Sequence, residues 1–223
     1  MMEGLPRQGP GEPSDVEWAI RTLGVPGDAR VLDAGCGPGA DVETFLALLP
    51  EARVTGVEIH APFVEEARER VPSERATFDV GDMRDAEGRF NLIWCAGALY
   101  FLGIEEGLSA FRAMLAPGGA VAFTEPVISD ETDLPFWGGY EAGTDAQVLE
   151  RTRSAGWDVV DSRRISQTAW ALYHDPLEAR IDALRPGASE ALKAVLDEGE
   201  KEIFEKRVDG DRNGYLHVLA RPQ

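Results

Sequence analysis

The feature that most constrains the fold is a regular alternation of short apolar segments with amphipathic ones between residues 29 and 125. The apolar segments predict strands at residues 29–34, 53–59, 75–80, 90–96 and 120–125. The segments between them predict helices at residues 41–49, 61–70 and 105–115. The strand at 90–96 is nearly all apolar, which is typical of a strand covered on both faces of a sheet. This alternation predicts a parallel, doubly wound α/β sheet.

The rhythm changes after residue 125. A long loop is expected at 126–143, a helix at 144–154, a strand at 157–165, helices within 167–207 broken at Pro186-Gly187, and a last strand at 214–220. A further helix is expected at 15–23, after a Gly/Pro-rich segment 1–13 that we expect to be flexible. The chain is therefore expected to form one domain over residues 1–223, with a seven-stranded, mostly parallel sheet and a helical cap at 167–207 inserted before the last strand.

The charge balance excludes several partners. The chain has 22 Lys+Arg against 40 Asp+Glu, a formal net charge of −18. Such a surface repels phosphate backbones and anionic headgroups, so neither nucleic acid nor membrane is expected as a partner. No apolar run is long enough to span a membrane, and no signal-peptide core begins the sequence. Two cysteines and three scattered histidines predict no disulfide framework and no metal site, and they favour the cytoplasm.

The strongest local motif is the glycine-rich turn Val-Leu-Asp-Ala-Gly-Cys-Gly-Pro-Gly at residues 31–39, between a strand and a helix. Alternate glycines let the backbone turn tightly and let a ligand approach closely. The helix that follows offers free amide groups, which predicts a nucleotide or nucleoside site. Gly35-x-Gly37-x-x-Ala40 fits the dinucleotide fingerprint, but Asp33 would place an anion near a pyrophosphate. A carboxylate suits a ligand with a cationic group.

The spacing Asp-x-Gly-x-Gly-x-Gly from Asp33 resembles the first motif of the class I methyltransferases, which use S-adenosylmethionine. Glu58, Gly81-Asp82-Met83, residues 90–98 and the turn at 115–119 resemble the family's later motifs, with Asn91 where many members carry Asp. The resemblance implies a Rossmann-like methyltransferase fold, a ribose contact from Glu58 and an adenine contact from Asp82. The implied cofactor-binding residues are Asp33, Gly35, Cys36, Gly37, Gly39, Glu58, Ile59, Asp82, Met83, Ala96 and Gly97.

A closer resemblance is to a group of small, mostly uncharacterised bacterial class I methyltransferases. It is carried by residues 7–11, 96–100, Trp170 with Tyr173 and Pro176, and residues 213–215. This group sharpens the expected fold and cofactor and leaves the substrate open.

The motifs that bind the methyl donor, S-adenosylmethionine, reveal little of the site for the molecule that accepts the methyl group. Methyl transfer mainly needs alignment of the two molecules and exclusion of water. Tyr100, Glu125 and His174 are the candidate catalytic residues. Tyr100, Trp137, Trp170 and Tyr173 are the candidate substrate-binding residues, and a cap-like insertion favours a small-molecule acceptor. Arg7 and Gln8 either fold over the methyl donor as a lid or belong to a disordered terminus, and the sequence leaves both open. An NAD-dependent oxidoreductase and a methyltransferase-like binding protein without turnover stay as alternatives, and the protein is expected to be a monomer or a homodimer.

Overall fold

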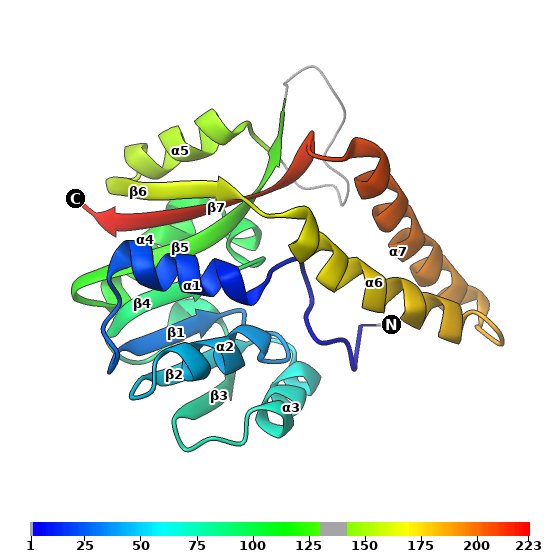
Figure 1. Ribbon diagram of the computed structural model, residues 1–223, viewed down its shortest axis with the longest axis horizontal. Coiled ribbons are helices and arrows are strands. Elements are labelled where there is room, and N and C mark those ends of the chain that lie inside the picture. The colour runs from blue at the N-terminus through cyan, green and yellow to red at the C-terminus, as the bar shows by residue number, and fades with distance from the viewer. Residues whose placement is uncertain (1, 130–141) are drawn as a thin grey trace.

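The computed structural model describes residues 2–129 and 142–223, and its centre is a seven-stranded sheet (Figure 1). In chain order the strands are β1 (Arg30–Ala34), β2 (Arg53–Glu58), β3 (Ala76–Val80), β4 (Phe90–Cys95), β5 (Leu115–Ile128), β6 (Trp157–Arg164) and β7 (Asn213–Pro222). Their order across the sheet is β3-β2-β1-β4-β5-β7-β6. Only β7 runs antiparallel to its neighbours, β5 and β6. The predicted mostly parallel, doubly wound sheet is confirmed.

Helices cover both faces of this sheet. Helices α1 (Pro13–Leu23), α2 (Ala40–Leu48) and α3 (Ala61–Arg70) pack on one face, and α4 (Ile104–Met114) and α5 (Asp145–Ser154) pack on the other. The apolar sequence of β4 follows from this arrangement. Leu92 and Trp94 belong to the apolar cluster on the side of α1–α3, and Ile93 and Cys95 belong to the cluster on the side of α4 and α5. Two short 3-10 helices, η1 (Met83–Asp85) and η2 (Leu99–Phe101), follow β3 and β4.

Strand β5 is longer than the sequence suggests. Its last residues, Val127 and Ile128, pair with Gly214 and Asn213 of β7, where the sequence predicts a loop from residue 126. The antiparallel partner β7 satisfies the backbone groups of this extension. Such long-range pairing cannot be predicted locally, because Pro126 argues against a strand at this point.

The cap consists of α6 (Gln167–Leu184) and α7 (Glu190–Asp209). They lie side by side beyond the end of the sheet toward which β1 points, at the right of Figure 1. The predicted break at Pro186-Gly187 separates them, and Gly187 has a φ of 92° that few other residues adopt. Trp170, Leu177 and Leu196 form the centre of an apolar cluster of their own.

The segment 2–12 lies against the molecule and is not merely a tail. Leu5 is 4% exposed and joins the cap cluster, and the Gly4 amide donates to the Glu66 carboxylate. Helix α1 begins at Pro13, two residues before the predicted start, with Glu12 as its N-cap, because Glu12 and Asp15 form a capping box. No helix in the described ranges is long and apolar enough to cross a membrane.

Candidate functional site

A cavity of about 570 Å³ lies at the sheet edge where β1, β2 and β4 end. It receives ten of the eleven predicted cofactor-binding residues, namely Asp33, Gly35, Cys36, Gly37, Glu58, Ile59, Asp82, Met83, Ala96 and Gly97. Gly39 is the exception. It caps α2 with a φ of 85°, and a Cβ there would meet the Cβ of Ala67 on α3 at 3.1 Å. Gly39 therefore allows helix packing and lies outside the cavity wall.

The glycine turn is locked onto the neighbouring strand. The amides of Gly35 and Cys36 both donate to the Val57 carbonyl, at 2.8 and 3.1 Å. Gly35 has a φ of 81°, and a Cβ there would lie 2.6 Å from the Cβ of Ala98. A side chain at position 35 would be strained and would also press on the floor of the cavity.

Asp33 is a buried residue of the cavity wall with one carboxylate oxygen unsatisfied in the described part of the chain. Its side chain is 3% exposed, and its Oδ2 accepts no hydrogen bond from the described residues. Burial raises the pKa of this carboxyl well above its ordinary value, and the nearby Asp41 raises it further while Arg7 opposes the effect. A buried carboxyl without a partner is unfavourable, and a cationic ligand group in the cavity would satisfy it.

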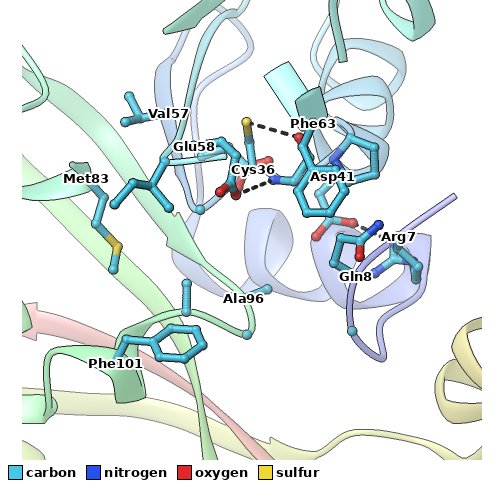
Figure 2. Close-up of a pocket in the computed structure, with 18 of the residues that line it drawn as sticks. Arg7, Gln8, Cys36, Asp41, Val57, Glu58, Phe63, Met83, Ala96 and Phe101 are labelled. Atoms are coloured by element: carbon cyan, nitrogen blue, oxygen red, sulfur yellow. Dashed lines mark hydrogen bonds and ion pairs between the residues drawn. The ribbon is translucent and has the colours of Figure 1, made fainter. Parts of the chain in front are cut away.

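Glu58 is held in place by backbone amides. Its Oε2 accepts from the Gly37 amide at 3.2 Å, and its Oε1 accepts from the His60 amide at 2.9 Å. Figure 2 shows Glu58 beside the Cys36 loop at the cavity wall. Because each carboxylate oxygen has a second lone pair, Glu58 can still accept two ligand hydroxyls.

Asp82 is already engaged with Arg84. Asp82 Oδ1 accepts from the Arg84 amide, and the two side chains form an ion pair at 2.6 Å. Hydrogen bonds from the Arg84 side chain and backbone lower the pKa of Asp82. This pairing fixes the carboxylate at the cavity wall as an acceptor.

The N-terminal segment closes the opposite side of the cavity. The Arg7 guanidinium pairs with Asp41 at 2.7 Å, and each side chain is 14% exposed. Asp41 also accepts from the indole N–H of the buried Trp94 at 2.9 Å. In Figure 2, Arg7 and Gln8 lie across the cavity from Met83. The sequence left open whether Arg7 and Gln8 form a lid or a disordered terminus, and it missed their partner Asp41, whose place in the first turn of α2 is a weak local signal.

A second cavity of about 630 Å³ adjoins the first beneath the cap. The residues that line both are Gln8, Gly9, Pro10, Gly97, Tyr100 and Phe101. Of the predicted substrate-binding residues, Trp170 and Tyr173 line the second cavity and Tyr100 lies at the junction. Trp137 falls outside the described residues. The described part of the chain thus brings three of these four side chains to one place.

Two predicted catalytic residues lie away from the cavity walls. His174 is 4% exposed, and its Nε2 lies 3.3 Å from Glu202 Oε1, which does line the second cavity. Glu125 lines neither cavity among the described residues. Neighbouring strand residues point to opposite faces, and it is Thr124 that lines the second cavity. Burial raises the pKa of Glu125 to about 8.

Sequence reasoning missed the wall supplied by α7. The residues Val195, Glu198, Gly199, Glu202 and Glu205 all line the second cavity. Their spacing places them on one helix face, and that spacing is the signal that could have found them. Among residues 2–129 and 142–223, no group of three or more His, Cys, Asp or Glu could hold a metal ion.

These features define a class I methyltransferase fold with a nucleoside-sized cavity at the sheet edge. Residues 31–119 match the family model described as a methyltransferase domain. A methyltransferase from Geobacter sulfurreducens, solved with S-adenosylhomocysteine, is similar over 97% of this chain and 94% of its own, with a TM-score of 0.81 and 20% identity. One from Thiobacillus denitrificans gives a TM-score of 0.80 at 20% identity, over 99% and 95%. The chain thus contains a stretch similar to a methyltransferase domain, and it has the fold of these two methyltransferases.

Curated relatives are similar over part of the chain. A trans-aconitate 2-methyltransferase of Paracidovorax citrulli is 36% identical over 101 residues, 44% of this chain and 39% of the relative. A malonyl-[acyl-carrier protein] O-methyltransferase of Pseudescherichia vulneris is 32% identical over 107 residues, 47% of this chain and 42% of the relative. The chain thus matches about two fifths of the length of these relatives.

Proposed function

We propose that this protein is an S-adenosylmethionine-dependent methyltransferase that acts on a small-molecule acceptor. The observation that carries the proposal is the pair of adjoining cavities at one sheet edge, the first of which contains the buried Asp33 carboxyl, whose Oδ2 has no partner among the described residues. A donor and an acceptor must meet at one point, and the shared wall formed by Gly97 and Tyr100 provides it.

The first cavity suits this donor because of its charges and its acceptors. Asp33 Oδ2 would take the donor's ammonium group, and Glu58 would accept the two ribose hydroxyls. Asp82 is the residue that would meet the adenine amino group, as in the family it resembles. A dinucleotide would instead bring a pyrophosphate toward Asp33, Asp41 and Glu58, which disfavours an NAD-dependent oxidoreductase.

When bound, S-adenosylmethionine supplies an activated methyl group on a sulfonium, open to in-line displacement. The protein then has to align the acceptor with that methyl group and exclude water. The Arg7–Asp41 pair closes the donor side, and the cap helices α6 and α7 close the acceptor side. Tyr100 at the junction can orient the acceptor atom. The Glu202 carboxylate, in contact with His174, can accept a proton if the acceptor carries one.

The second cavity supports a small acceptor. Its volume of about 630 Å³ lies within the range of small-ligand sites, roughly 300 to 1,000 Å³. We also propose that the protein works as a monomer or homodimer in a reducing compartment, the cytoplasm. Both cysteines are free and buried, and burial raises the pKa of each thiol, which leaves them unreactive.

Calorimetric titration separates the candidates. We expect micromolar or tighter binding of S-adenosylhomocysteine and none of NAD at the same concentrations. Tight NAD binding without S-adenosylhomocysteine binding would overturn the proposal. A panel of small acceptors then tests turnover through release of S-adenosylhomocysteine. Donor binding with no product from any acceptor would favour a binding protein of the same fold.

A further inference from the structure

We propose that the acceptor is a small organic amine, bound in its cationic form beneath the cap by carboxylates of α7 and by aromatic rings. This inference rests on the proposed function and names its substrate class. It concerns the second cavity. The family model ends at residue 119, so it does not cover the residues of the cap that line this cavity.

The charge of this cavity is the first argument. Its described wall contains three carboxylates, Glu198, Glu202 and Glu205, and one ammonium group, that of Lys201. Lys201 Nζ lies 3.6 Å from Glu205 Oε1, so one carboxylate already compensates it. The charged groups of the described wall therefore favour a cation and repel an anion.

The aromatic wall is the second, independent argument. Tyr215 stacks on Trp170 with ring centroids 5.5 Å apart, and on Tyr100 with centroids 5.8 Å apart. All three rings line the cavity. Stacked aromatic faces attract ammonium groups and also offer a flat surface to an apolar substituent.

The protein itself places a cation on this ring stack. Lys206 Nζ lies 4.9 Å from the Trp170 ring centroid, although Lys206 is 4% exposed. It donates to the carbonyls of Gly210 and of Asn213, the latter at 2.8 Å. An ammonium group is thus accommodated against these rings inside the cap.

The names of the curated relatives do not carry over to this cavity. Trans-aconitate is a tricarboxylate, and a cavity for it needs several cationic side chains. No arginine lies in the described wall of the second cavity, and the match to that relative covers 44% of this chain. The acceptor chemistry has to be inferred from the cap of this chain itself.

The bound ammonium loses one proton to the Glu202 carboxylate and from there to water, which leaves a neutral amine with its lone pair. The amine nitrogen forms a bond to the methyl carbon of the sulfonium donor, and the carbon–sulfur bond breaks with its electron pair on sulfur. The products are the N-methylated ammonium and S-adenosylhomocysteine.

Three probes with one skeleton test the charge preference: phenethylamine, phenethyl alcohol and hydrocinnamate, which are cationic, neutral and anionic. Binding is measured by calorimetry with S-adenosylhomocysteine already saturating the protein. We expect the amine to bind at least about tenfold more tightly than the alcohol, and the carboxylate to bind most weakly. Equal binding of the three, tighter binding of the carboxylate, or no binding of the amine would overturn the proposal.

The variants Glu198→Gln and Glu202→Gln locate the effect. We expect each to weaken amine binding about three- to tenfold and to leave the alcohol unchanged. Glu190→Gln is the matched control, because Glu190 lies on the same helix with its side chain 91% exposed and lines neither cavity. An equal loss of amine affinity in the control would overturn the assignment to this wall.

Failure of this inference differs from failure of the proposed function. If S-adenosylhomocysteine binds and the amine preference is missing, only the acceptor class is wrong. If S-adenosylhomocysteine does not bind at all, the proposed function itself is wrong.

Discussion

The two cavities are built in different ways. Most of the donor cavity consists of strand ends and backbone turns, where Gly35, Cys36 and Glu58 are held by main-chain hydrogen bonds. The acceptor cavity is walled largely by side chains on the faces of α6 and α7, such as Trp170 and Glu198. A turn that depends on backbone geometry tolerates few substitutions, whereas a helix face can exchange side chains without changing its path.

Because the two walls are built differently, one fold can keep the ligand of the first cavity while the ligand of the second changes. The family model matches residues 31–119, which supply most of the donor cavity, and it stops before the cap. A substitution in one cavity is therefore expected to alter the binding of one ligand and leave the other unchanged.

The largest effect is expected for Asp33→Asn. The variant removes the buried carboxyl that would pair with the donor's ammonium group, and we expect S-adenosylhomocysteine to bind about 100- to 1000-fold more weakly. Because burial already disfavours the charged carboxyl, the variant is expected to be at least as stable as the parent to urea. Calorimetry and urea denaturation measure the two quantities.

Asp79→Asn is the control for this prediction, since Asp79 is exposed on β3 and does not line the donor cavity. Amine binding beneath the cap is expected to change less than twofold in Asp33→Asn. A loss of amine binding as large as the loss of donor binding would break the separation between the cavities.

The second prediction concerns Glu125, on strand β5, which lies between β4 and β7 in the sheet. In the folded protein its pKa is raised to about 8 from an ordinary value of 4.5. As the pH rises through this interval, the unfolded chain releases a proton that the folded chain keeps. The free energy of unfolding therefore falls as pH rises, by an amount of the order of 5 kcal/mol for this group over the whole interval.

Glu125→Gln should remove this dependence. Urea denaturation at about pH 5.5 and about pH 8.5 should show a smaller loss of stability in the variant than in the parent. Because Glu125 lines neither described cavity wall, donor and amine affinities should stay unchanged. A drop in turnover at unchanged stability would instead restore its predicted catalytic role.

The contrast between the cavities also explains what could be predicted from the sequence. The strands and the glycine turn were predictable because apolar runs and the motif from Asp33 are local patterns, and this turn fixes where the donor cavity lies. The extension of β5 to Ile128 depends on pairing with β7, which is distant in sequence. Glu202 and Tyr215 meet only through the packing of the cap against β7, so no local pattern marks them as neighbours.

Glu125 shows how far the sequence can predict the direction of a side chain within a single strand. As the last residue of the strand predicted at 120–125, it was expected at the site, but one residue of register decides which face a side chain takes, and Thr124 lines the cavity instead.

The third prediction concerns closure of the donor cavity. Arg7→Gln removes the ion pair with Asp41, and we expect S-adenosylhomocysteine to bind about tenfold more weakly, mainly through faster dissociation. Stopped-flow displacement measures that rate. Arg21→Gln is the control, because Arg21 pairs with Glu17 on the exposed face of α1, away from the donor cavity. An unchanged dissociation rate in Arg7→Gln would mean that the segment does not retain the ligand.

The smallest effect is expected where the cavities meet. Tyr100 lines both of them, and its ring stacks on that of Tyr215 with centroids 5.8 Å apart. Tyr100→Phe keeps the stacked ring and removes the hydroxyl, so we expect a two- to fivefold loss of amine affinity and a similarly small loss for S-adenosylhomocysteine. Titration of each ligand alone and then in the presence of the other measures their coupling. A shared wall predicts that the variant lowers this coupling, whereas a large loss confined to the donor would place Tyr100 in the donor cavity only.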